Sequence, residues 1–239
     1  MMEQLKENEK KEKLVIIGNK PYFNLQLNTI LDSFDRNIRC NMSIPNLNNG
    51  TKCDGWALCD HIYDNVIGKP LSESALIARY KPNYDVEKIK EFYKNKPNIS
   101  EYSFFLSPRS MGVNKSICNS ILKQLKCPYS FSKDPRMGYL VLFWAIQRNA
   151  DIYISNWSIT NEKRVTYYVK EYQTLGGGLK TTIPYEVPGH DAKSEVLILR
   201  WLHQNQYIDA SLCLLNDETE YAFNDDILQP SDYILNKLK

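Results

Sequence analysis

Short apolar runs that end in a small or polar residue recur along the chain. Leu14–Ile17, for example, stops at Gly18 and Asn19. Runs of four to six residues followed by turn residues are typical of buried strands. The pattern predicts strands at Leu14–Ile17, Asn37–Asn41, Trp56–Asp60, Leu76–Tyr80, Asp151–Asn156 and Ala210–Leu215.

Longer segments carry apolar residues at helical spacing. Between Lys115 and Lys126, apolar side chains recur on one face of a helix. A strongly apolar helix is expected to run from Asp134 to Ile146, with Asp134 as the cap and Pro135 in the first turn. The predicted helices are Val86–Asn95, Lys115–Lys126, Asp134–Ile146 and Ser194–Gln204.

The order of these elements predicts an α/β fold. Strands that alternate with helices favour a mostly parallel sheet flanked by helices, here a single Rossmann-like domain over residues 14–239 after a solvated leader, residues 1–13. Ligands of such sheets bind beyond the carboxyl ends of the strands. Gly18, Asn19, Asn41, Asp60 and Asn156 follow strands, and we expect them at that edge.

One polar segment interrupts the pattern. Thr160–Glu186 is rich in tyrosine and contains Gly176, Gly177 and Gly178. A long segment of this kind in a compact domain is usually either a lid or disordered. We expect a flexible lid at about residues 160–186 that closes over a ligand.

Composition narrows the class of protein. The net charge of +2 gives no field that favours nucleic acid. The six cysteines form no CxxC pair, so a zinc site is not expected. The charged start, MMEQLKENEKKEK, has no apolar signal region, and no run is long enough to span a bilayer. These features predict a cytoplasmic protein.

The motifs of several enzyme classes are missing. The turn after the first strand, IIGNKPYF, is not a glycine-rich dinucleotide turn, and the chain has no Walker loop or nucleophile elbow. It also has no D-x-D pair, which enzymes using nucleoside-diphosphate sugars often need to hold a divalent metal. We therefore expect chemistry that requires no metal and no cofactor.

Four stretches, taken in order, resemble the bacterial sialyltransferases of glycosyltransferase family 42, the lipooligosaccharide or O-antigen type. Together they span most of the chain from Leu14 to Leu215. The stretches are IIGNKP from Ile16, RCN from Arg39, MGYLVLFWAIQRNADIYISNW from Met137 and GHDAKSE from Gly189.

The resemblance implies a GT-A-like variant of the Rossmann fold. It implies inverting, metal-independent transfer of sialic acid from CMP-sialic acid to a galactose-type hydroxyl of a surface glycan. The family's catalytic base corresponds to His190, one of three histidines in the chain. An unperturbed imidazole has a pKa near ~6.5, so it is largely neutral near pH 7 and can accept the hydroxyl proton.

The resemblance also assigns residues that bind the donor. Gly18 and Asn19 correspond to the nucleotide-contacting turn, and the RCN asparagine is Asn41. A further family asparagine falls at Cys59 or Asp60. The helix-and-strand stretch adds four more residues: Gly138, Asn156, Trp157 and Ser158.

Some family groups are replaced in this chain. Met137 stands where the family has a small hydroxyl residue that touches the donor carboxylate, and Arg136 can compensate with its guanidinium. Of the two lid tyrosines that hold the leaving phosphate, the first aligns with Thr160 and the second with Tyr167 or Tyr168.

Alternative interpretations stay open at this point. His190 is either the base or a loop residue without a role. The chain could use another CMP-activated acid, such as Kdo or another nonulosonate. It could also be a binding module without catalysis, or an unrelated α/β enzyme such as a methyltransferase.

The expected partners are a CMP-sugar donor and a glycan acceptor, the latter lipid-linked by the resemblance. The C-terminal YILNKLK, from Tyr233, mixes apolar residues with lysines and predicts weak peripheral contact with the inner face of the cytoplasmic membrane. The oligomeric state is left open, with a homo-oligomer among the alternatives.

Overall fold

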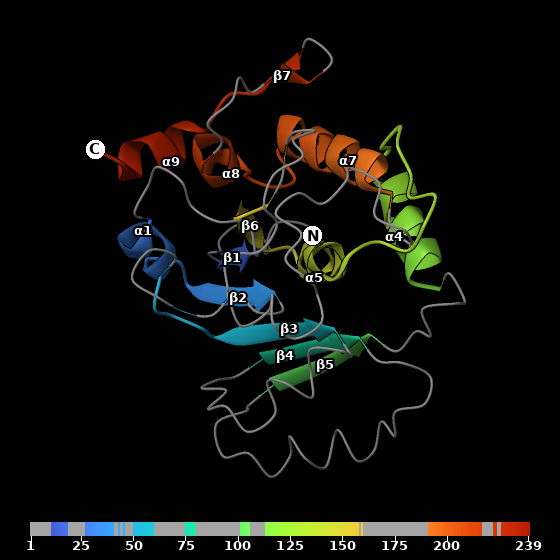
Figure 1. Ribbon diagram of the computed structural model, residues 1–239, viewed down its shortest axis with the longest axis horizontal. Helices are drawn as coiled ribbons and strands as arrows, with labels where there is room; N and C mark the ends of the chain where they lie inside the picture. Colours follow the sequence, from blue (N-terminus) through green and yellow to red (C-terminus); the bar gives the residue numbers. More distant parts are fainter. Residues whose placement is uncertain are drawn as a thin grey trace, which may run out of the picture.

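The computed structural model shows an α/β protein built on one parallel sheet (Figure 1). It describes residues 11–18, 27–40, 43, 45, 50–59, 75–79, 101–105, 113–157, 159, 191–216, 222–223 and 226–239. Within these residues, six strands pair side by side in the order β5-β4-β3-β2-β1-β6. They are β1 (Lys13–Ile17), β2 (Arg36–Cys40), β3 (Gly55–Cys59), β4 (Ala75–Arg79), β5 (Glu101–Phe105) and β6 (Asp151–Ser155).

Both faces of β1, which lies between β2 and β6, are buried, and this explains why its sequence is a continuous apolar run. Leu14 and Ile16 belong to one core cluster, and Val15 and Ile17 belong to another. Successive side chains of a strand point to opposite faces of a sheet, so the two clusters lie on opposite sides of it.

Helices cover each face (Figure 1). The first cluster contains residues of α4, α5, α7 and α8, and the second contains residues of α1, α8 and α9. The predicted arrangement, a sheet flanked by helices, is confirmed. The helices are α1 (Asn28–Asp32), α4 (Val113–Gln124), α5 (Met137–Gln147), α7 (Ala192–Gln204), α8 (Ser211–Asn216) and α9 (Asp232–Lys237).

Two sequence-based predictions are wrong. Ala210–Leu215, expected as a strand, forms most of α8, because a short apolar run fits a buried helix as well as a strand. Asp134 does not cap α5, whose N-cap is Arg136 without a side-chain cap bond. Instead, Asp134 accepts a hydrogen bond at 3.4 Å from the backbone N–H of Lys115 in the first turn of α4.

Other elements were not predicted. They are the strand β5, the helices α1 and α9, and an antiparallel pair of short strands, β7 (Ala222–Phe223) and β8 (Asp226–Ile227). The helix predicted at Val86–Asn95 lies outside the described residues.

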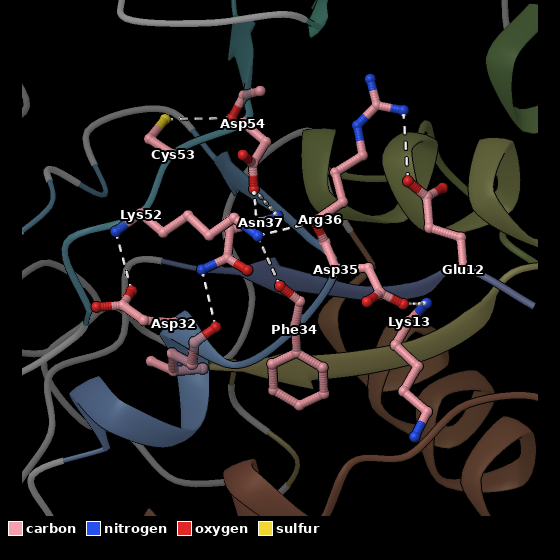
Figure 2. A network of polar contacts seen from close by, with 12 residues as sticks. Glu12, Lys13, Asp32, Phe34, Asp35, Arg36, Asn37, Lys52, Cys53 and Asp54 are labelled. Atoms are coloured by element: carbon pink, nitrogen blue, oxygen red, sulfur yellow. Dashed lines mark hydrogen bonds and ion pairs between the residues drawn. The ribbon is translucent and has the colours of Figure 1, made fainter.

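A polar network fixes the amino ends of three neighbouring strands (Figure 2). The backbone N–H of Lys13 donates to the carboxylate of Asp35 at 2.9 Å, and that of Asn37 donates to Asp54 at 2.7 Å. The ammonium of Lys52 donates to the backbone oxygen of Asp35 at 2.8 Å and lies 3.3 Å from the Asp54 carboxylate. These groups hold the sheet at the edge opposite the carboxyl ends of its strands.

Candidate functional site

The strand order reverses at β1, so a ligand is expected beyond the carboxyl ends of β1 and β6. The chain runs outward from β1 through β5 and then returns to place β6 on the other side of β1. Ligands of open α/β sheets bind at such a switch point, beyond the carboxyl ends of the strands. Here these ends are joined by a 2.8 Å hydrogen bond from the N–H of Gly18 to the carbonyl of Ser155.

Trp157 lies against two glycines at this edge. A Cβ atom on Gly18 would lie 2.6 Å from Cδ1 of Trp157 and 2.4 Å from the backbone oxygen of Asn156. A Cβ atom on Gly138, in the first turn of α5, would lie 2.7 Å from Cζ2 of the same indole. The glycines are therefore required so that the ends of β1 and β6 and the start of α5 can meet.

Trp157 is only 8% exposed, and its Nε1 is buried with no hydrogen-bond partner. The ring of Tyr139 packs against it edge-on, with 5.2 Å between ring centroids. Gly18, Gly138 and Trp157, each predicted to bind substrate, are thus neighbours. The indole forms a packed wall of the site.

Asn156 follows β6 in the left-handed conformation, with a φ of 60°. Asparagine tolerates this region better than most residues, and such conformations cluster at functional sites. The residue is 2% exposed, and its Oδ1 accepts a 3.0 Å hydrogen bond from the Ser155 hydroxyl. The structure therefore places it beside Gly18, as predicted.

A buried acid holds Arg136 at the start of α5. Oε1 of Glu195, on α7, accepts a 3.0 Å hydrogen bond from the backbone N–H of Arg136. Its Oε2 lies 3.2 Å from Nε of the same arginine but makes no hydrogen bond. Glu195 is 2% exposed, whereas the Arg136 side chain is 37% exposed. Glu195 belongs to the GHDAKSE stretch, but it was not among the predicted site residues.

The environment of Glu195 changes its protonation. Burial raises the pKa of Glu195 to about 7, while the Arg136 guanidinium and its backbone N–H act in the opposite direction, and Asp191 adds to the rise. The site therefore contains a carboxyl group that exchanges its proton near neutral pH.

This shift predicts how stability depends on pH. The pKa of Glu195 is higher in the folded than in the unfolded chain. The contribution of Glu195 to the free energy of unfolding is therefore fully present at low pH. That contribution falls as the pH rises from about 4.5 to about 7. At ~1.4 kcal/mol for each unit of pKa, the loss is about 3 kcal/mol. We expect the free energy of unfolding of Glu195→Gln, measured with urea, to gain about this amount over the wild type between pH 4.5 and 8. A constant difference would contradict the shift.

The N-terminus of α7 is tied to the segment before α5. Asp191 is the N-cap, and its carboxylate accepts from the N–H of Ser194 at 3.1 Å and from the Ser194 hydroxyl at 2.7 Å. The hydroxyl of Ser132 also donates to Asp191. Burial alone would raise the pKa of Asp191, but the bonds from Ser132 and Ser194 lower it below its ordinary value. His190 directly precedes this cap in the sequence.

Several predicted site residues lie outside the part of the chain that the structure describes, as does the predicted lid at 160–186. These residues are Asn19, Asn41, Asp60, Ser158, Thr160, Tyr167, Tyr168 and His190.

A cavity of about 710 Å³ opens at the other end of β6, near Asp151, Asn149 and Tyr207. These residues lie at the amino end of the strand, so the cavity is separate from the candidate site. His203 also borders it.

The C-terminal segment forms α9 and is partly packed. Ile234 is buried, whereas Leu235 and Leu238 are 37% and 38% exposed, with Lys237 and Lys239 beside them. Within the described residues, no helix is both long and apolar enough to cross a membrane. Peripheral membrane contact through this segment stays a prediction.

The fold is that of the sialyltransferases. The chain is similar to the monofunctional alpha-2,3-sialyltransferase Cst-I from Campylobacter jejuni, with 15% identity, a TM-score of 0.50, and coverage of 100% of this chain and 97% of that one. It is also similar to the sialyltransferase CstII from Campylobacter jejuni solved with cytidine-5'-monophosphate, with 15% identity, a TM-score of 0.50, and coverage of 97% and 98%. A structure of CstII with the substrate analogue CMP-3FNeuAc gives 17% identity, a TM-score of 0.49, and coverage of 95% and 98%.

No protein-family model matches the sequence, and the curated protein sequences give no match. The predicted resemblance to the bacterial sialyltransferases of family 42 is confirmed by the structural match over nearly the whole chain. At this level of identity, the match establishes the fold.

Proposed function

We propose that the protein is a sialyltransferase. It moves sialic acid from CMP-sialic acid to a galactose-type hydroxyl of a bacterial surface glycan, such as lipooligosaccharide or O-antigen, with inversion and without a metal. The observation that carries this proposal is the meeting of Gly18, Asn156, Trp157 and Gly138 at the switch point of a sheet with the sialyltransferase fold.

In the proposed reaction, His190 is the general base. Its neutral imidazole accepts the proton of the acceptor hydroxyl as the hydroxyl oxygen bonds to the anomeric carbon of the sialic acid. The bond from that carbon to the phosphate oxygen breaks, and the electron pair leaves with CMP. Support comes from the sequence position of His190, one residue before the N-cap of α7, since Glu195 and Asp191 tie this helix to the start of α5.

Donor binding is assigned to the carboxyl edge of the sheet. Gly18, Asn19 and Asn41 are proposed to receive the nucleotide, because they follow β1 and β2 in the sequence. Amides donate hydrogen bonds without adding charge, which suits phosphate and carboxylate oxygens. Asp60 and Ser158 are proposed to complete this set, by resemblance.

Other residues are proposed to bind the negatively charged carboxylate and phosphate of the donor. The guanidinium of Arg136 can pair a carboxylate or phosphate through two N–H groups. Tyr167 or Tyr168 is proposed to hold the leaving phosphate when the segment 160–186 closes over the donor.

Hydrolysis of the donor without an acceptor tests the proposal. A sialyltransferase should release CMP slowly from CMP-sialic acid, whereas a binding module should bind the donor and leave it intact. A panel that includes CMP-Kdo separates the alternative donors, because the true donor should be hydrolysed fastest. No release of CMP from any member of the panel would overturn the proposed activity.

Release of CMP in the presence of an acceptor tests the expectation that no metal is needed. Because the chain has no D-x-D pair, excess EDTA should leave most of the transfer activity intact. A loss of activity that magnesium or manganese restores would contradict it.

A further inference from the structure

We propose that Glu195 is a positioning residue whose proton controls anion binding by Arg136: the site takes up a proton when Arg136 binds the donor's carboxylate or phosphate. This inference rests on the proposed function, which supplies the anionic ligand.

The geometry joins the two residues through both the main chain and the side chain. One oxygen of Glu195 receives the Arg136 backbone N–H at 3.0 Å, and the other lies 3.2 Å from Arg136 Nε. The second oxygen is buried and has no hydrogen-bond partner, although a carboxylate can accept several. The ionised form of Glu195 is therefore stabilised by a single cation, the Arg136 guanidinium. The neutral form loses little stabilisation when that guanidinium binds another anion.

Arg136 has the capacity for a second anion. Its side chain is 37% exposed, and only its Nε side faces Glu195. Within the described part of the chain, no hydrogen bond or ion pair engages its two terminal nitrogens. A guanidinium offers five N–H donors in a planar fork, so it can bind an external carboxylate or phosphate beside the internal one.

The charges around Glu195 determine whether anion binding raises or lowers its pKa. Arg136, at the start of α5, is the cation that faces it, and Asp191, on its own helix, opposes its ionisation. The Tyr139 hydroxyl, also on α5, donates to the backbone oxygen of Glu195 at 2.7 Å. An anion on Arg136 would add a second negative charge that competes for one guanidinium, and like charges disfavour the ionised form.

Protonation of Glu195 is accessible at neutral pH, since burial has already raised its pKa to about 7. Anion binding should move that pKa further upward. The site then takes up part of a proton per donor at pH values between about 7 and the higher pKa of the complex, and less at pH 6, where Glu195 is already largely neutral. By linkage, affinity for the donor should fall as the pH rises, by at most about tenfold per pH unit.

Calorimetric titration with the donor analogue CMP-3FNeuAc tests this, because its carboxylate and phosphodiester stay anionic from pH 6 to 9. Titrations in two buffers of different ionisation enthalpy give the number of protons taken up. The wild type should take up a substantial fraction of a proton at pH 8, and its Kd should increase between pH 7 and 9. Binding without proton uptake would overturn this inference alone. Absence of binding at every pH would overturn the proposed function as well.

Two variants assign the proton. Glu195→Gln keeps the shape and an oxygen for the Arg136 N–H, so it should bind the analogue with no proton uptake and no increase in Kd above pH 7. Arg136→Lys keeps the charge but loses the planar fork, and its affinity should fall about tenfold or more. Uptake that persists in Glu195→Gln and disappears in His190→Ala would assign the proton to the histidine and overturn the inference.

Discussion

Replacement of His190 by alanine is expected to reduce sialyl transfer by roughly 10²–10⁴-fold, the usual contribution of a positioned general base. Binding of CMP should change little, because the base acts on the acceptor hydroxyl. The pH–rate profile should lose its acidic limb, since the base must be neutral to accept a proton. Steady-state kinetics and calorimetry with CMP measure the two effects separately.

The fold should survive this substitution for reasons that the structure gives. The N-cap of α7 is Asp191, which bonds to the Ser194 N–H, and the helix is anchored by Val196, Leu199 and Leu202, all buried. Circular dichroism and thermal unfolding should match those of the wild type. Near-normal transfer by a folded His190→Ala variant would make the histidine incidental.

The control for this experiment cannot be His203, on α7. His203 is half-buried: its Nδ1 accepts the Ala210 N–H at 3.1 Å and its Nε2 lies 3.0 Å from the Gln229 oxygen. His203→Ala would leave backbone groups unpaired and lower stability. Lys193, exposed on the first turn of α7, is a better site for a matched alanine control.

The sequence predicted β1 and β6 well because both strands are buried on both faces. Runs such as Leu14–Ile17 and Ile152–Ile154 have few interpretations other than a buried strand, given their length and the turn residues that follow. The apolar run at Ala210–Leu215 was mistaken for a strand because six residues carry too little periodicity to distinguish a strand from the helix α8.

The candidate site was predicted only in part. Gly18, Gly138 and Trp157 follow from a resemblance in sequence, and their close contact gives that pattern a physical cause. The pairing of Arg136 with Glu195 joins residues 59 positions apart. Its strength depends on burial that arises only when α5 packs against α7, and no local pattern in the sequence reports that.

The close contacts around Trp157 lead to a second large effect, in which two similar substitutions are expected to differ. At Gly138, an added methyl group meets only the outer ring of Trp157, at 2.7 Å. The indole cannot move aside easily, because Gly18 and Tyr139 contact its other parts. Gly138→Ala should therefore cost about 1–3 kcal/mol in stability, the usual cost of overpacking, reduced by the better helix propensity of alanine. Replacing Trp157 with phenylalanine removes the outer ring, so the double variant Gly138→Ala, Trp157→Phe should recover this loss relative to Trp157→Phe alone.

At Gly18, the nearest atom to an added methyl is the backbone oxygen of Asn156, at 2.4 Å. Backbone cannot rotate away as a side chain can, and Asn156 is already held at a φ of 60°. Gly18→Ala should therefore separate the ends of β1 and β6 and lower the affinity for CMP. The loss in the free energy of unfolding should be at or above the ~1–3 kcal/mol typical of overpacking. Trp157→Phe should not rescue it. Urea unfolding of the single and double variants, with CMP titration of those that fold, checks both expectations. Equal rescue at both glycines would mean that the Trp157 indole alone causes the close contact at Gly18. The Asn156 backbone would then play no part in it.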